Sequence, residues 1–218
     1  MIQRNSHNLK INWGKVVDCC GLSSLMGDSS ELENNTSYTV SVTIREAQLQ
    51  DIKALTEVLT LSFHPPKGWL SFFQPILKLG VYEDLRSRLR GTIPYYCCFV
   101  AVEKTSTLTK TTEKVIGTIE LSLKSGFNCH YLYISNLAVI QSHRRQGIAK
   151  QLLQQCEEIA SKWGYDTLNL HVLDNNYPAK KLYLSNGYQV SETEVTWPNW
   201  LLFRSQRLFL KKQIKTHD

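Results

Sequence analysis

The stretch that decides the fold reads YLYISNLAV at 131–139 and RRQGIA at 144–149. The first segment has the apolar content of a strand. Apolar residues at helical spacing follow the second as far as Trp163, where Gly164 is placed to cap a helix. Gly147 therefore lies where a strand passes into a helix. The missing side chain at such a junction lets a phosphate approach the backbone, and unpaired N–H groups at the helix start can bind it.

Arg144 and Arg145 add positive charge beside Gly147. The alternative is that Gly147 only eases a turn and that both arginines are solvated. A glycine alone at a helix start would favour that alternative, because glycine is the default residue of tight turns. The sequence around Gly147 is therefore needed to distinguish a phosphate-binding junction from a simple turn.

Hydrophobic periodicity outlines the elements on either side of this junction. Strands are expected at 40–44, 95–102, 115–123, 131–139, 167–172, 188–190 and 200–209, and helices at 51–64, 148–163 and 179–184. Residues 63–90 are interpreted as short helices and loops that line a cleft, and the polar residues 103–114 as a long exposed hairpin loop. This order implies a mixed sheet covered by helices.

Length and composition indicate one globular domain. The chain has 218 residues, of which 42% are hydrophobic and 20% charged, and residues 1–37 are polar and aperiodic. We therefore expect a flexible extension at 1–37 and a folded domain at 38–218. No apolar run approaches the ~20 residues that cross a bilayer. The first residues lack the apolar stretch of a secretory signal, so we expect a cytoplasmic protein without a membrane contact.

Charge and cysteine content limit which classes of partner, cofactor and metal ion are expected. The net charge of +6 and the pI near 9.0 suit nucleic acid and a phosphate-rich cofactor equally well. Because the basic residues are spread out and no nucleic-acid-reading motif accompanies them, a nucleic-acid partner is not expected. The six cysteines include no Cys-x-x-Cys pair, and no histidine stands at zinc-finger spacing. We therefore expect no metal ion.

The junction resembles the pyrophosphate loop of the GNAT superfamily of acyl-CoA N-acyltransferases, which has the pattern Arg/Gln-x-x-Gly-x-Gly/Ala. That pattern is matched by Arg144 to Ala149. The preceding Leu137-Ala-Val139 is similar to the family's splayed strand, whose exposed backbone groups pair with the pantetheine arm of coenzyme A. A second block, Asn176 to Tyr188, resembles the family pattern Asn-x-x-Ala-x-x-Leu-Tyr-x-x-x-Gly-Phe, with Tyr188 in place of the final Phe. The resemblance extends from about Tyr38 to the C-terminus.

This resemblance implies the GNAT fold, an α/β (α+β) architecture. The fold has a central mixed, mainly antiparallel sheet of six to seven strands with a splayed strand pair, and about four flanking helices. The resemblance also implies acetyl-CoA as co-substrate. The cofactor-binding residues that it implies are Leu137, Ala138, Val139, Arg144, Arg145, Gln146, Gly147, Ile148, Ala149, Lys150, Asn176 and Tyr183. For Asn176, a cap on the following helix is an alternative role.

The implied reaction is transfer of the acetyl group to a primary amine by direct attack in a ternary complex. The chain is similar to plastid and cyanobacterial-type members of the family. That similarity implies protein N-terminal α-amines and lysine ε-amines as acceptors, and the plastid stroma as the location if the protein is plastid-encoded or imported. A polyamine or an antibiotic-like amine is the alternative acceptor, and a non-catalytic acyl-CoA sensor is the alternative function.

The attacking amine must be neutral, yet a lysine amine has a pKa of about 10.4 and an α-amine one of about 7.7 to 8. His171 is one candidate for the base, and Glu120, acting through water, is the other. By resemblance, Tyr183 is the general acid that protonates the departing CoA thiolate. A core histidine and a helix-packing tyrosine are the alternatives. The backbone N–H of Leu137 or of a neighbour would stabilise the oxyanion.

The acceptor is expected to enter against residues 63–90 and the loop around 192–200. Aromatic side chains there could line a peptide groove, although core packing is the more frequent role of any single one. These residues are Trp69, Phe72, Phe73, Trp197 and Trp200. An intact pyrophosphate loop together with Tyr183 favours an enzyme over a sensor.

Overall fold

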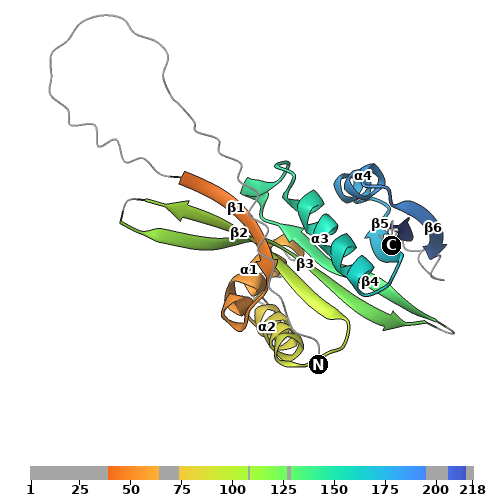
Figure 1. The fold of residues 1–218 in the computed structure, drawn as a ribbon, viewed down its shortest axis with the longest axis horizontal. Coiled ribbons are helices and arrows are strands. Elements are labelled where there is room, and N and C mark those ends of the chain that lie inside the picture. Colours follow the sequence, from red (N-terminus) through yellow and green to blue (C-terminus); the bar gives the residue numbers. More distant parts are fainter. Residues whose placement is uncertain (1–38, 64–73, 108, 127–128, 195–205, 215–218) are drawn as a thin grey trace, which may run out of the picture.

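A seven-stranded sheet in the order β1-β2-β3-β4-β5-β7-β6 forms the centre of the molecule (Figure 1). The computed structural model describes residues 39–63, 74–107, 109–126, 129–194 and 206–214. The strands are β1 Thr39–Glu46, β2 Tyr96–Ser106, β3 Thr111–Ser125, β4 His130–Val139, β5 Thr167–Leu173, β6 Gln189–Glu194 and β7 Arg207–Gln213. Neighbouring strands are antiparallel except β4 and β5, which are parallel. The expected mixed, mainly antiparallel sheet is confirmed.

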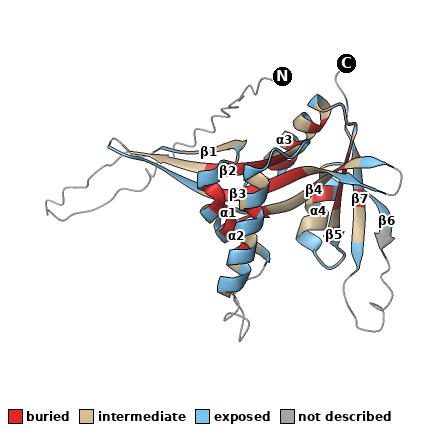
Figure 2. Cartoon of the chain, turned by 90° about the horizontal axis from the view of Figure 1, so that it is seen from below, coloured by how far each residue is buried: buried red, intermediate tan, exposed pale blue. Residues whose placement is uncertain are grey.

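Helices cover both faces of this sheet. The described residues form α1 Ile52–Phe63, α2 Gln74–Arg90, α3 Ile148–Lys162 and α4 Tyr177–Ser185, with short 3-10 turns η1 Leu49–Asp51 and η3 Gln141–His143. Successive residues of β2 point to opposite faces. Phe99 and Ala101 therefore join the core against α3, whereas Val100 and Val102 join the core against α1 and α2. Figure 2 shows the buried residues in the central strands, with α1 and α2 on one side and α3 on the other.

The parallel contact between β4 and β5 is short. The two strands pair only at Leu132 with Leu168 and at Tyr133 with Asn169. The Asn169 side chain strengthens this point, because its Nδ2 donates a hydrogen bond of 3.0 Å to the Leu132 carbonyl. Beyond Tyr133, β4 keeps its antiparallel partner β3 but no longer pairs with β5. The expected splayed strand pair is therefore confirmed.

Helix α2 corrects the expectation of short helices and loops over residues 74–90, whereas residues 64–73 of that stretch lie outside the described residues. It is one continuous helix of 17 residues. Its helical pattern is weak, because Leu85 is its one fully buried residue and Ile76 and Leu79 are exposed. Pro75 lies in the first helical turn, where proline is tolerated.

The hairpin of β2 and β3 is longer than expected. Residues 103–114 are not a long loop, because the strands continue to Ser106 and resume at Thr111. These outer strand segments are polar because they face solvent, and Lys104 pairs with Glu113 at 2.7 Å across the hairpin. The last strand is also displaced along the sequence, to Arg207–Gln213 instead of 200–209. Residues 200–205 of that expected strand lie outside the described residues.

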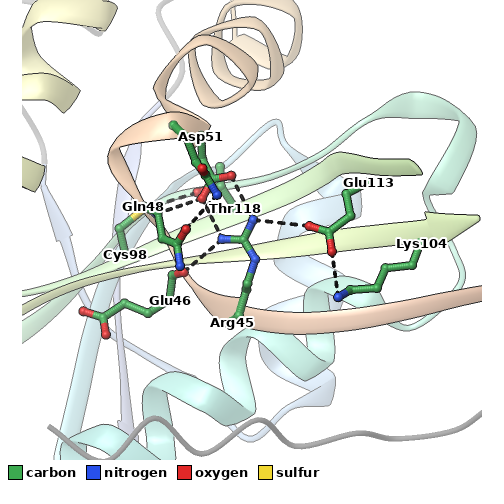
Figure 3. A network of polar contacts seen from close by, with 9 residues as sticks. Arg45, Glu46, Gln48, Asp51, Cys98, Lys104, Glu113 and Thr118 are labelled. Carbon is green, nitrogen blue, oxygen red and sulfur yellow. Dashed lines mark hydrogen bonds and ion pairs between the residues drawn. The ribbon is translucent and has the colours of Figure 1, made fainter. Parts of the chain in front are cut away.

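A polar network joins β1 to the start of α1 (Figure 3). The Arg45 guanidinium donates two hydrogen bonds to the Asp51 carboxylate, at 2.6 and 2.9 Å, and the Gln48 backbone N–H donates a third at 2.7 Å. Burial alone would raise the pKa of Asp51, but the hydrogen bonds from Arg45 and Gln48 outweigh it. The pKa is therefore lowered from its ordinary value. The charged form of Asp51 stabilises the entry into α1.

Asp51→Asn should lower the free energy of unfolding at pH 7 by about 1–3 kcal/mol, because the substitution weakens charge-assisted hydrogen bonds in a buried setting. A lowered folded-state pKa means that the stabilisation exists above the ordinary pKa of about 4 and is lost as pH falls through the folded value. The difference between wild type and variant should therefore shrink below pH ~4. Urea unfolding at several pH values measures it. Glu57→Gln, an exposed change on α1, is the control, and a difference independent of pH would contradict the assignment.

Tyr188, the residue that departs from the family pattern, is 1% exposed. Its hydroxyl is buried and has no hydrogen-bond partner among the described residues. The ring meets Tyr183 edge to face at 5.7 Å. An unsatisfied buried hydroxyl is destabilising, whereas the aromatic ring contributes core packing.

Tyr188→Phe should therefore raise the free energy of unfolding by about 1 kcal/mol, or Tm by about 2–4 °C, since it removes the unpaired hydroxyl and keeps the ring. Calorimetry of both proteins measures the change. A lower Tm in the variant would show that the hydroxyl contributes a favourable contact.

Candidate active site

A cavity of about 540 Å³ opens where β4 and β5 separate. Its strand walls are residues 133–137 of β4 and 171–173 of β5. Helices α1 and α2 supply an apolar wall that includes Leu59 and Leu85, together with the charged side chains of Asp84 and Arg88. Another part of the cavity wall comes from the α4 region, with Asn176, Ala179 and Tyr183. The loss of pairing in the sheet thus exposes strand edges inside a cavity that several elements surround.

Helix α4 brings two predicted residues to this cavity. The Asn176 side chain accepts a hydrogen bond of 3.3 Å from the Ala179 N–H, so it caps α4 as the alternative interpretation held. Tyr183, about two turns further on, also lines the cavity and is 8% exposed. Burial raises the pKa of Tyr183 to about 12. Its hydroxyl therefore remains protonated at neutral pH and can donate a proton.

His171 lies on β5 and faces the same cavity. The Tyr133 hydroxyl is 2.9 Å from His171 Nδ1, and Phe209 packs against the imidazole with ring centroids 4.9 Å apart. The pKa of Tyr133 is raised, because burial outweighs the opposite effect of Arg207. The imidazole is therefore held in one orientation by a tyrosine and a phenylalanine.

Sequence reasoning missed Tyr133. A signal for it existed, because Tyr133 stands two residues before Ser135 on the strand that leads into Leu137, and residues at even spacing share one face of a strand. The pairing of Tyr133 with Asn169 then places His171 on the same face of the neighbouring strand. The strand register that this inference needs comes only from the three-dimensional structure.

Glu120 is brought close to the cavity without lining it. The residue is 1% exposed. Its Oε2 accepts a bond of 2.5 Å from Arg88, and its Oε1 accepts one of 2.9 Å from Asn136 Nδ2. Arg88 and Asn136 line the cavity, so contact between Glu120 and a molecule in the cavity would run through these side chains.

The loop after β4 carries most of the predicted cofactor-binding residues. Arg144 Nε donates a bond of 2.9 Å to the Val139 carbonyl, which ties the loop to the strand end. Gly147 precedes the first residue of α3 with φ of 80°, a left-handed conformation that favours glycine. Arg145, Gln146 and Lys150 are exposed beside it. The arrangement presents N–H groups of a helix start and positive charge to solvent, which suits an anion.

The other predicted residues differ in exposure. Leu137 lines the cavity, whereas Ala138, Val139 and Ile148 are buried. Ala149 is half-buried. The aromatic residues expected on the acceptor side, which are Trp69, Phe72, Phe73, Trp197 and Trp200, lie outside the described residues.

The cysteines among the described residues do not line the cavity. Burial raises the pKa of the Cys98 thiol to about 12 and that of the Cys156 thiol well above its ordinary value. Such thiols are poor nucleophiles. Within the described ranges, no group of three or more metal-ligating side chains is found. None of the described helices combines the length and apolar content that a bilayer crossing requires.

The family profile described as Acetyltransferase (GNAT) family matches residues 68–188. Among known proteins, the chain is 27% identical over 225 residues to GCN5-related N-acetyltransferase 10, chloroplastic, of Arabidopsis thaliana. That match covers 94% of this chain and 88% of the relative.

Two solved structures share the fold. The PaiA N-acetyltransferase of Thermoplasma acidophilum in complex with coenzyme A has a TM-score of 0.56 at 19% identity, over 79% of this chain and 99% of that one. The ribosomal-protein-S18-alanine N-acetyltransferase of Escherichia coli has a TM-score of 0.54 at 18% identity, over 82% of this chain and 97% of that one. Because the family profile matches more than half of the chain, and because the fold and the splayed strands agree with it, the chain belongs to the GNAT family of acetyltransferases, which use acetyl-CoA as acetyl donor.

Proposed function

We propose that the chain acetylates a primary amine of a protein or peptide, either an N-terminal α-amine or a lysine ε-amine, by direct attack in a ternary complex. The observation that carries the proposal is the cavity at the β4–β5 gap, which is walled by α1 and α2 on one side and by the α4 region on another. Donor and acceptor can meet there without a covalent enzyme intermediate. Such alignment of two reactants supplies much of the rate gain in a direct transfer.

The donor is assigned to the α3 and α4 side of this gap. The start of α3, with Arg144, Arg145, Gln146, Gly147, Ile148, Ala149 and Lys150, would hold the pyrophosphate through N–H groups and positive charge. The unpaired edge of β4 at Leu137, Ala138 and Val139 would bind the pantetheine arm through backbone groups. Asn176 and Tyr183 would then lie near the thioester.

The acceptor is assigned to the α1 and α2 side. Leu59, Val81 and Leu85 give this wall an apolar surface, on which Asp84 is ion-paired with Arg88. A mostly apolar wall with a few polar groups suits a side chain or peptide segment that carries an amine. These features support a protein or peptide acceptor over a polyamine, whose several charges would meet a mostly apolar surface.

His171 is proposed as the base that accepts the amine proton. Its imidazole lines the cavity, and histidine is the side chain that most often serves as a general base. In the proposed tautomer, His171 Nδ1–H donates to the Tyr133 hydroxyl, which orients the ring, and Nε2 accepts the amine proton. The Leu137 backbone N–H would stabilise the oxyanion. Tyr183 is proposed to protonate the departing thiolate, since its raised pKa keeps it protonated.

Tyr183→Phe should lower kcat by about 100-fold, because general acid catalysis contributes about 10²- to 10⁴-fold. The affinity for acetyl-CoA should change by less than about threefold, because the aromatic ring and its packing remain. Stopped-flow measurement of CoA release gives kcat, and calorimetric titration gives the affinity. A loss confined to acetyl-CoA affinity would contradict a role as acid and favour a packing role.

His171→Gln should lower kcat/KM by about 100-fold at pH 7, and the loss should diminish at higher pH as more of the acceptor amine is neutral. Tyr133→Phe should cost less, about tenfold, because it removes the orienting hydrogen bond and leaves the imidazole. The pH dependence of kcat/KM measures both effects. Equal activity of wild type and His171→Gln across pH would transfer the base role to Glu120.

The acceptor is identified by mass spectrometry of a peptide panel incubated with acetyl-CoA and the chain. Products on the α-amine and on the ε-amine of the same lysine-containing peptide are resolved by fragmentation. Acetylation of polyamines but of no peptide would replace the proposal with a small-amine acetyltransferase. Tight acetyl-CoA binding without transfer to any amine would favour a sensor.

The plastid is the proposed location, supported by the chloroplastic relative. A fusion of the full chain to a fluorescent protein, observed in plant cells, tests it, and fluorescence confined to the cytosol would contradict it. We also propose that 38–218 is the catalytic domain and 1–37 a polar extension, although residues 1–38 lie outside those described. A chain that begins at Tyr38 should then keep wild-type turnover.

A further inference from the structure

Glu120 is a carboxylate buried inside the sheet region, at 1% exposure on β3. Burial of a carboxylate is costly unless it is paired and hydrogen-bonded. Both oxygens are used, and they are used by different elements. Oε2 accepts from Arg88 on α2 and Oε1 accepts from Asn136 on β4. One carboxylate therefore connects the helix of the acceptor wall to the strand that borders the donor site.

The Asn136 end of this connection lies at a β-bulge. Thr118 pairs with Ala138 and Glu120 pairs with Ser135, so two residues of β4 face one residue of β3. Asn136 has φ of 54°, a left-handed conformation that asparagine adopts more readily than most residues. A bulge of this kind redirects the backbone that follows it. The next residue is Leu137, whose N–H is proposed as the oxyanion donor.

The Arg88 end holds the acceptor wall. Besides its one fully buried residue, Leu85, helix α2 packs three partly buried apolar residues against the core. Arg88 follows Leu85 by one turn, pairs with Asp84 on the same helix and reaches Glu120 on the sheet. The ion pair between Arg88 and Glu120 therefore fixes the position of Arg88 and, through it, of Asp84 in the cavity wall. Loss of the pair should therefore change how the acceptor is bound.

We propose that Glu120 is a positioning residue that acts on both substrates' sites at once. Through Asn136 it holds the bulge that aims the Leu137 N–H, and through Arg88 it holds α2 against the acceptor. The inference rests on the proposed function. It does not require Glu120 to accept a proton, since its oxygens are occupied by Arg88 and Asn136 and it does not line the cavity.

Three substitutions separate the two connections. Asn136→Gly keeps the left-handed conformation accessible but removes the amide, and should lower kcat by about 10- to 100-fold with acceptor KM nearly unchanged. Arg88→Gln should raise acceptor KM by about fivefold to tenfold and change kcat by less than about twofold. Glu120→Gln keeps an oxygen for Asn136 and loses the charge for Arg88. The kcat and acceptor KM of Glu120→Gln should therefore change as they do in Arg88→Gln.

Glu120→Ala removes both connections and should combine the two effects. In the double variant Glu120→Ala/Asn136→Gly, kcat should be no lower than in Glu120→Ala alone, because both changes break the same contact. Steady-state kinetics with the peptide acceptor found by mass spectrometry provide kcat and KM. Arg86→Gln is the matched control, since Arg86 pairs with Glu83 on the exposed face of the same helix and should leave both parameters unchanged.

Hydrogen exchange supplies a readout besides activity. Amides at 135–139 should exchange faster in Glu120→Ala and Asn136→Gly, and at the wild-type rate in Glu120→Gln. The inference is overturned if Glu120→Gln loses turnover as completely as Glu120→Ala while Asn136→Gly stays active, because that pattern belongs to a base. Wild-type protein that acetylates no amine would instead refute the proposed function, and exchange at 135–139 would still test the connection.

Discussion

The parallel contact between β4 and β5 is the constraint on which the rest of the site depends. It consists of two residue pairs, reinforced by the Asn169 side chain on the Leu132 carbonyl. A longer ladder would close the sheet, because the backbone N–H and C=O groups of β4 and β5 would pair with each other. A shorter ladder would no longer fix the position of His171 beside Tyr133. Because pairing stops at Tyr133, the backbone edges of both strands open into a cavity instead of a continuous sheet.

Packing on both faces keeps this opening from collapsing. The alternating side chains of β2 serve two separate cores, one against α3 and one against α1 and α2. The central parts of the antiparallel strands β2 and β3 are therefore buried on both faces, and β4 is anchored to β3 along most of its length. Interiors packed in this way deform little. Strand β4 is thus held in place by its pairing with β3, although it separates from β5 on its other side.

Buried charge is placed where it joins different elements of the fold. Asp51 joins β1 to α1 through Arg45, and Glu120 joins α2 to β4 through Arg88 and Asn136. Each carboxylate has a guanidinium partner and a further hydrogen-bond donor, which is what makes burial of the charge tolerable. The two differ in location. Asp51 stabilises the entry to a helix, whereas Glu120 lies beside the cavity and couples its two sides.

Local sequence determined the order of the strands and the positions of α1, α3 and α4, since each helix has strong periodicity or a clear cap, but it misplaced the last strand and the ends of the β2–β3 hairpin. Gly147 and the Asn176 to Tyr188 block were also readable, because a left-handed turn and a helix cap depend on residues close in sequence. Helix α2 was expected only as short helices and loops, because Leu85 is its one fully buried residue and exposed apolar residues such as Ile76 and Leu79 blur the periodic signal. Only the tertiary structure decided the pairing of Tyr133 with His171 and the connection of Glu120 to Arg88 and Asn136. These contacts join residues 16 to 38 positions apart, and they depend on strand register and helix placement, which the pattern of apolar residues does not encode.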